Sequence, residues 1–106
     1  MKKILIIDDE KNIRFLISSI LQDEGYNTIE ASSVPESELI IENKKFDLAI
    51  IDISLKDKKK DGIYLLKKIK KLNSTIPIIM ISGHATIQIA VDSMKLGAYE
   101  FLEKPF

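Results

Sequence analysis

The chain has 106 residues, which is enough for one domain with a substantial core but not for two. Hydrophobic residues make up 45% and charged residues 30%, and a formal net charge of zero gives no general electrostatic reason to bind nucleic acid or an anionic membrane. The absence of cysteine excludes disulfides and thiolate metal sites, and Arg14 is the only arginine, which disfavours bidentate reading of phosphates or bases.

The hydrophobic pattern predicts strands and helices in strict alternation. In chain order we expect a strand at 3–7, a helix around 13–21 that stops at Gly25, a strand at 26–31, a helix from 34 to about 43, a strand at 47–52, a helix that follows Asp61, a strand at 76–81, a helix around 87–94 that stops at Gly97, and a strand at 99–103. No repeat, low-complexity tract or linker interrupts this order.

Two helix starts carry a capping signal. Ser33 and Glu36 have the spacing of a capping box, with Pro35 in the first turn, where its missing N–H is not needed. Asp61 precedes an apolar periodic segment and is a plausible N-cap.

Alternation of this kind predicts an α/β fold, a doubly wound five-stranded parallel sheet with helices on both faces and right-handed connections. The flavodoxin-like strand order 2-1-3-4-5 makes the first and third strands neighbours. A chain that ends on its fifth strand lacks a final helix, so we expect part of one face to be uncovered. The apolar surface near residues 13–21 is then a candidate site for dimerisation or aggregation.

The carboxyl ends of four predicted strands carry chemically useful side chains. Asp8 and Asp9 end the first strand, Asp52 the third, Ser82 the fourth and Lys104 the fifth. Parallel strands end at the same edge of a sheet, so three carboxylates would crowd one crevice and repel one another. A hard divalent cation such as Mg²⁺ relieves that repulsion, and a lysine and a hydroxyl opposite it would suit a phosphoryl group.

Each of these residues also has a simpler explanation when taken alone. Asp8 or Asp61 could be only a helix cap, Ser82 only a turn residue, and Lys104 only a solvated side chain before a proline. The combination is more specific than its members, because four separate strand ends would have to supply fitting groups by chance.

The motif set resembles the receiver domain of bacterial two-component response regulators, over the whole chain. The residues that carry the resemblance are Asp8-Asp9, Asp52, Ser82 and Lys104-Pro105. The resemblance implies that Asp52 accepts a phosphoryl group from a phosphohistidine on a sensor histidine kinase. It further implies that Mg²⁺ is bound by Asp9 directly, by Asp8 mostly through water, by Asp52, and by the backbone carbonyl of Ser54.

The same resemblance assigns the response to the modification. Ser82 would hydrogen-bond one phosphoryl oxygen and Lys104 would pair with another, while Phe101 occupies the position of the switch aromatic. Added charge at the rim would then shift the surface of the fourth helix and fifth strand. Such a domain is a phosphoacceptor with at most slow self-dephosphorylation, not an enzyme.

The segment between Asp52 and Asp61 departs from the common pattern. It is longer than in most receivers, and its lysine-rich run at 56–60 reads as a solvated loop or, alternatively, as a patch for docking a partner. Ser54 and His84 stand at the two positions that flank the path of hydrolytic water in the family. We therefore consider both residues for tuning dephosphorylation, with a solvated loop tip as the alternative for His84.

The longer loop and the stretch from Ile81 to the chain end are most similar to receivers of NtrC/NtrX-type regulators. That similarity implies that residues 1–106 form a receiver truncated before its fifth helix, within a larger transcriptional regulator whose output domains bind DNA. Expected partners are the kinase, those output domains and a second copy, with no nucleic acid bound by this domain and no membrane. No apolar stretch approaches the roughly 20 residues of a membrane span, so a cytoplasmic location is simplest.

Two other functions stay open at this stage. A phosphohydrolase with an aspartyl-phosphate would want an acid two residues after its nucleophile, whereas Asp52 is followed by Ile53-Ser54. A degenerate receiver that is never phosphorylated would serve only as a protein-interaction module. Treatment with acetyl phosphate and Mg²⁺ distinguishes these readings.

Overall fold

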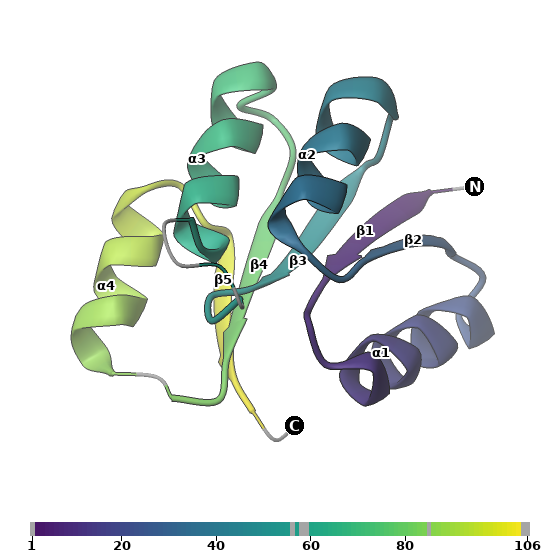
Figure 1. The fold of residues 1–106 in the computed structure, drawn as a ribbon, viewed down its shortest axis with the longest axis horizontal. Helices are drawn as coiled ribbons and strands as arrows, with labels where there is room; N and C mark the ends of the chain where they lie inside the picture. Colours follow the sequence, from purple (N-terminus) through teal and green to yellow (C-terminus); the bar gives the residue numbers. More distant parts are fainter. Residues whose placement is uncertain (1, 56, 58–59, 85, 105–106) are drawn as a thin grey trace.

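The computed structural model describes residues 2–55, 57, 60–84 and 86–104. Strands and helices alternate as the hydrophobic pattern predicted (Figure 1). The elements are β1 Lys3–Ile7, α1 Lys11–Asp23, β2 Asn27–Ala31, α2 Val34–Asn43, β3 Leu48–Asp52, α3 Gly62–Leu72, β4 Ile78–Ser82, α4 Ile87–Lys95 and β5 Glu100–Glu103. Predicted and observed boundaries differ by a few residues at most.

All neighbouring strands are parallel, and the sheet has the expected order β2-β1-β3-β4-β5. The register pairs Ile7 with Ile51, Asp52 with Ile81, and Ser82 with Glu103. This register brings the carboxyl ends of β1, β3, β4 and β5 to one edge. Figure 1 shows α1 on one side of the sheet and α2, α3 and α4 on the other.

The core is divided between the two faces of the sheet. In β1 the side chains of Leu5 and Ile7 join the larger cluster, beneath α2 and α3, while those of Ile4 and Ile6 join the smaller one beside α1. Alternate strand residues point to opposite faces, so a strand buried on both faces is apolar throughout. This explains why β1 and β3 read as uninterrupted apolar runs.

Both predicted helix caps are present. Ser33 accepts a hydrogen bond from the Glu36 N–H at 3.2 Å, and Asp61 accepts one from the Tyr64 N–H at 3.1 Å. The Glu36 carboxylate accepts from the N–H of Ser32, one residue before the donor of an ideal capping box. Gly25 and Gly97 have φ values of +92° and +102°, which explains glycine at these two helix ends.

Of the apolar residues that predicted α4, namely Ile87, Ala90, Val91 and Met94, only Ala90 is partly buried. Ile87, Val91 and Met94 are 86%, 40% and 45% exposed, while the buried residue of the helix is Ser93. Periodicity therefore located this helix correctly but did not identify the side that packs on the sheet.

The face of the sheet beside α1 is partly uncovered, as expected. Phe15 and Ile20 of α1 are 70% and 53% exposed, and Leu102 of β5 is 43% exposed. A hollow of about 190 Å³ lies between α1 and this face, and all of its lining residues are apolar: Ile17, Ile20, Leu21, Ile50, Ile79, Ile81 and Leu102. Among the residues that the structure describes, no helix is long and apolar enough to cross a membrane.

Candidate functional site

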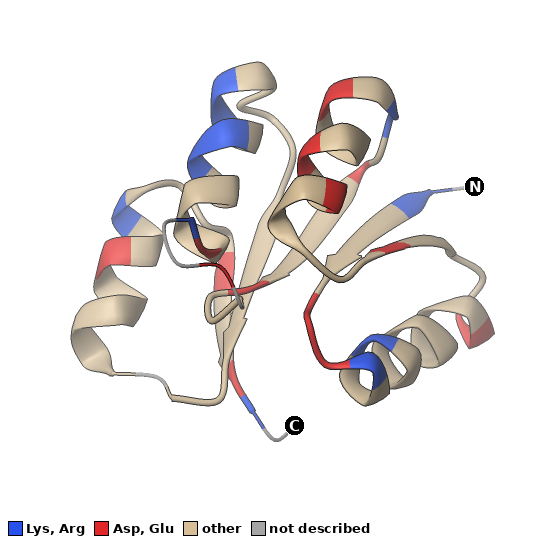
Figure 2. Cartoon of the chain, in the orientation of Figure 1, with Lys and Arg blue, Asp and Glu red and all other residues tan. Residues whose placement is uncertain are grey.

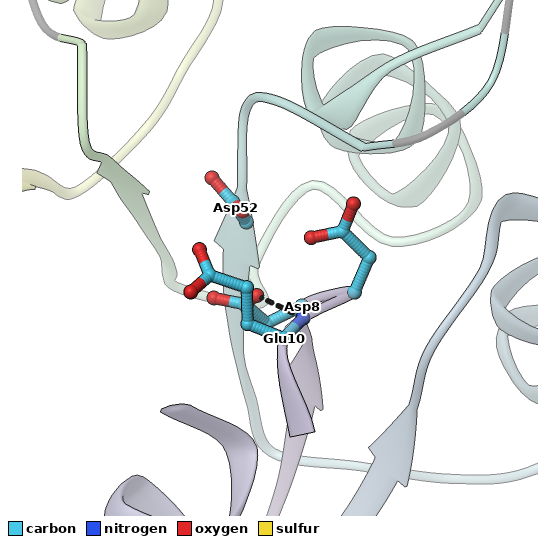
Figure 3. A group of neighbouring side chains, drawn as sticks. Asp8, Glu10 and Asp52 are labelled. Atoms are coloured by element: carbon cyan, nitrogen blue, oxygen red, sulfur yellow. Dashed lines mark hydrogen bonds between the residues drawn. The ribbon is translucent and has the colours of Figure 1, made fainter. Parts of the chain in front are cut away.

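The sheet gathers the predicted residues at one edge. Asp8 directly follows β1, Asp52 and Ser82 are the last residues of β3 and β4, and Lys104 directly follows β5. Figure 3 shows the side chains of Asp8, Glu10 and Asp52 near one another at the ends of two strands. In Figure 2 the segment between β1 and α1 is coloured as acidic.

Four carboxylates form the centre of this edge. Ligand oxygens of Asp8, Asp9, Glu10 and Asp52 all lie within 4.8 Å of one another. Asp8 is fully buried and Asp52 is 2% exposed, which is unusual for acids without a cationic partner. Asp8, Asp9 and Asp52 were predicted as site residues, whereas Glu10 was not.

Lys104 supplies the cation. Its Nζ lies 2.8 Å from Asp8 Oδ2, 3.2 Å from Asp52 Oδ2 and 3.2 Å from Glu10 Oε1. Burial by itself would lower the pKa of Lys104, but the hydrogen bond with Asp8 and the charges of Asp52 and Asp8 outweigh burial and raise that pKa. Lys104 is therefore a permanent positive charge inside the acidic cluster.

The pKa of Asp52 is raised above its usual value. Burial, and next the charge of Asp8, raise the pKa of Asp52 from 3.8 to about 6. The contact with Lys104 and the N–H of Ser54, which donates to Asp52 Oδ1 at 3.2 Å, act in the opposite direction. The contacts that lower the pKa of Asp52 therefore do not cancel the effects of burial and of the nearby Asp8 carboxylate.

The backbone and one arginine fix the position of Asp8. Its Oδ1 accepts the N–H of Glu10 at 2.8 Å, and its backbone carbonyl accepts Arg14 Nη1, also at 2.8 Å. Arg14 also contacts Glu30 Oε1 at 3.4 Å. The only arginine thus supports the acidic edge from α1, a role that sequence reasoning missed because it depends on where a long side chain folds back.

Ser54 contacts Asp52 through its N–H, whereas His84 contacts Ser82 at the end of the neighbouring strand. Ser82 is buried and its Oγ accepts the N–H of His84 at 3.1 Å, while the residues Ser54 and His84 are exposed. The Lys104 N–H donates to the carbonyl of Ser82 at 2.8 Å, which ties β5 to the end of β4. The ligand role predicted for the Ser54 carbonyl stays a prediction, and so does the tuning role of Ser54 and His84.

Gly62, at the start of α3, packs against the backbone of the phosphoacceptor candidate. Its N–H donates to the carbonyl of Ile53 at 3.0 Å. A Cβ at this position would clash with the Asp52 carbonyl oxygen and lie 2.7 Å from Ile53 Cα. Only glycine allows this approach, so the first turn of α3 buttresses the end of β3.

The remaining predicted residues lie at the margins of the site. Phe101 is partly buried and packs against the larger core cluster. Of the lysine-rich run, Lys60 is described: its Nζ lies 3.7 Å from Glu38 Oε1 and 4.9 Å from the centre of the Tyr64 ring. Residues 56, 58, 59, 105 and 106 lie outside the described residues, so the docking patch and the proline after Lys104 stay predictions.

The donor set fits a divalent cation. Carboxylate oxygens are the ligands that Mg²⁺ and Ca²⁺ prefer, and Asp8 and Asp52 are buried while Asp9 and Glu10 reach the surface. A cation bound there would have protein oxygens on its inner side and open access to solvent on the other. Oxygen-only donors and the lack of histidine in the cluster make a softer metal a poorer fit.

Comparison with known proteins agrees with this geometry. The model of the response regulator receiver domain matches residues 4–106. An NtrX-like response regulator of Rickettsia typhi is 46% identical over 103 residues, which cover 97% of this chain. The aligned part is 22% of that relative, so the chain spans about a fifth of its length.

Solved structures give the same result. The receiver domain of NtrX from Brucella abortus superposes with a TM-score of 0.89 at 43% identity, covering 97% of this chain and 86% of that one. A response regulator protein from Burkholderia pseudomallei has a TM-score of 0.91 at 27% identity, covering 100% and 61%. The Burkholderia structure contains a phosphorylated aspartic acid, a calcium ion and citrate.

Proposed function

The chain belongs to the response regulator receiver domain family, and we propose that it is a phosphorylation-dependent signalling switch with Asp52 as the phosphoacceptor. One observation carries this proposal: Lys104, from the end of β5, lies within 3.2 Å of buried carboxylates from the ends of both β1 and β3. Three strands thus contribute opposite charges to one point. Phosphoryl transfer needs this kind of prearranged charge more than it needs covalent chemistry.

In the proposed reaction a carboxylate oxygen of Asp52 attacks the phosphorus of a phosphohistidine on a sensor histidine kinase. A P–O bond forms while the N–P bond breaks, and the electron pair of that bond stays on the imidazole, which takes up a proton. Lys104 and the Ser82 hydroxyl would pair with two oxygens of the transferred group. The acyl phosphate in the Burkholderia structure supports the same chemistry for the corresponding fold.

Asp8, Asp9 and Asp52, with the Ser54 carbonyl, would hold Mg²⁺. When bound, the cation supplies positive charge that offsets the repulsion between the acids and the incoming phosphoryl group. Asp8 would remain fixed by the Glu10 N–H and by Arg14, so the ligand set would be largely preorganised. In tight metal sites, neighbouring groups hold the metal ligands in position before the metal binds.

The readout of the switch is proposed for α4 and β5. Ser82 ends β4 immediately before the segment that leads to α4, and Phe101 lies in the neighbouring strand β5, where it pairs with Met80. If Ser82 turns toward the phosphoryl group, the N–H of His84 loses its acceptor. Phe101 would respond by turning inward, as the resemblance to receiver domains implies. The output would be transcription, through DNA-binding domains of a longer regulator, in the cytoplasm, where its kinase partner presents phosphohistidine.

The test is incubation with acetyl phosphate and Mg²⁺ followed by intact-protein mass measurement. We expect a gain of one phosphoryl group that is lost in Asp52→Asn and retained in Asp23→Asn, a matched loss of an exposed carboxylate at the end of α1. Asp9→Asn should greatly weaken Mg²⁺ binding in a titration. A wild-type chain that gains no mass would identify a degenerate receiver that acts only through protein contacts.

A further inference from the structure

Glu10 is the acid at the site to which the proposed function gives no role. It occupies the N-cap position of α1 with φ −91° and ψ 110°, but its side chain makes no capping hydrogen bond. Its carboxylate instead contacts the ammonium of Lys104, from the opposite end of the chain. Glutamate is not a preferred N-cap residue, so the contact with Lys104, and not helix capping, is the interaction that this side chain makes at the site.

Three carboxylates crowd the ammonium of Lys104. Its Nζ donates hydrogen bonds to Glu10 Oε1 and Asp52 Oδ2, both at 3.2 Å, and forms an ion pair with Asp8 Oδ2 at 2.8 Å. A phosphoryl oxygen that pairs with Lys104 would be a fourth negative oxygen at this ammonium, so it competes with the carboxylates already there.

Exposure decides which acceptor can withdraw. The Asp8 side chain is fully buried and makes the shortest contact, at 2.8 Å. The Asp52 side chain is 3% exposed and would itself carry the incoming group. The Glu10 side chain is 61% exposed, so it can leave Lys104 and be hydrated with no movement of the sheet.

We propose that Glu10 is a positioning residue whose carboxylate accepts a hydrogen bond from Lys104 until a phosphoryl oxygen on Asp52 replaces it. This inference rests on the proposed function and adds a competition to it. Glu10 keeps Lys104 oriented toward the rim in the resting state, and it opposes phosphorylation by a modest amount. The amount is modest because exposed ion pairs are weak, so Glu10 adjusts the switch and does not block it.

Beryllofluoride, a noncovalent stand-in for the phosphoryl group, tests the competition at equilibrium. In NMR titrations with saturating Mg²⁺, we expect Glu10→Gln to bind beryllofluoride about two- to five-fold more tightly than the wild type. The difference should shrink at high ionic strength, because salt screens an exposed pair. Glu103→Gln is the matched control, since Glu103 is exposed, adjacent to Lys104 and has no ion pair within the described residues.

Glu10→Asp separates contact from charge. This variant keeps the negative charge but shortens the side chain by one methylene, so it should lose the contact with Lys104. Its affinity for beryllofluoride should then resemble that of Glu10→Gln. Binding equal to the wild type would mean that Glu10 acts only through general repulsion, and would overturn the proposal.

Magnesium affinity separates competition from metal binding. In a titration with Mg²⁺ alone, Glu10→Gln should bind about as tightly as the wild type. A marked loss would instead make Glu10 a metal ligand and overturn the inference. Failure of the inference is distinct from failure of the proposed function, because the latter would show as a wild-type chain that binds no beryllofluoride and gains no phosphoryl group on Asp52.

Discussion

At the scale of single residues, the folded structure destabilises the charged form of Asp52. It is 2% exposed, and burial together with the charge of Asp8 raises its pKa from 3.8 to about 6. Between pH 4 and 6 the folded chain therefore binds a proton that the unfolded chain has released. The contribution of Asp52 to the free energy of unfolding therefore falls as the pH rises from 4 to 6, and it stays low at neutral pH.

Asp52→Asn should therefore be more stable than the wild type at pH 7, by about 2 to 3 kcal/mol for a shift of this size. The gain should decrease on acidification and nearly vanish near pH 4, where the wild-type carboxyl is protonated too. Urea unfolding at a series of pH values measures this. Lys104 keeps Asp8 and Glu10 as partners in the variant.

Asp23→Asn, at the exposed end of α1, serves as the comparison and should show no such pH-dependent gain. If Asp52→Asn is equally destabilised or unchanged at every pH, the acidic cluster does not strain the fold.

Sequence reasoning identified the site residues whose position follows from a strand end, and it missed those that depend on side-chain direction. Asp8, Asp52, Ser82 and Lys104 could be placed because parallel strands end at one edge. Glu10 follows a strand as well, but its sequence position does not predict the contact with Lys104, which lies 94 residues away.

At the scale of elements, Gly62 packs the start of α3 directly against the backbone at the end of β3. Gly62→Ala should destabilise the fold by about 1 to 3 kcal/mol, because the new Cβ clashes with the Asp52 carbonyl and the helix must retreat. The retreat should also slow phosphorylation, since it moves the backbone of the acceptor. Chemical unfolding and acetyl phosphate kinetics measure the two effects.

Gly83→Ala is a matched control, because a Cβ there would meet only Lys104 Cδ at 3.9 Å, an ordinary contact. It should be nearly neutral in stability. Equal effects of the two substitutions would remove the special role assigned to the start of α3.

The helix α4 is held less firmly than α3. Ser93 is its buried residue, whereas α3 buries Gly62, Leu65, Leu66 and Ile69. Amides of α4 should therefore exchange with solvent deuterium at least about tenfold faster than those of α3, measured by native-state hydrogen exchange. Equal protection would argue that α4 opens only with the whole domain and would weaken its candidacy as the readout element.

The elements themselves were predictable because local signals agreed with one another. Caps at Ser33 and Asp61 and glycines at 25 and 97 mark helix ends by short-range chemistry. The packed side of α4 was not predictable, because Ser93 is buried and Ile89 packs on the core, while Ile87, Val91 and Met94 are exposed. An apolar stripe predicts which side of a helix faces the core only when the stripe itself packs against the core.

At the scale of the whole molecule, the two faces of the sheet are unequally covered. The strand order and both faces were predictable because alternation and right-handed connections leave few topologies. The exposed apolar residues beside α1 include Phe15, Ile20 and Leu102. We expect the chain to self-associate through this face in a concentration-dependent manner.

Sedimentation velocity over a range of concentrations tests this expectation. Ile20→Lys should weaken association about tenfold, whereas Leu39→Lys, on the exposed side of α2 across the sheet, should not. Equal sensitivity to both substitutions, or a monomer at every concentration, would contradict it.

The distance along the chain between Glu10 and Lys104 has a consequence for how the molecule is made. The two residues are 94 positions apart, and Asp52 lies 52 positions from Lys104. During synthesis the acids of β1 and β3 emerge before Lys104, so they lack this cationic partner until β5 joins the sheet. We therefore expect a nascent or partly unfolded chain to lack the arrangement of charges proposed for phosphoryl transfer.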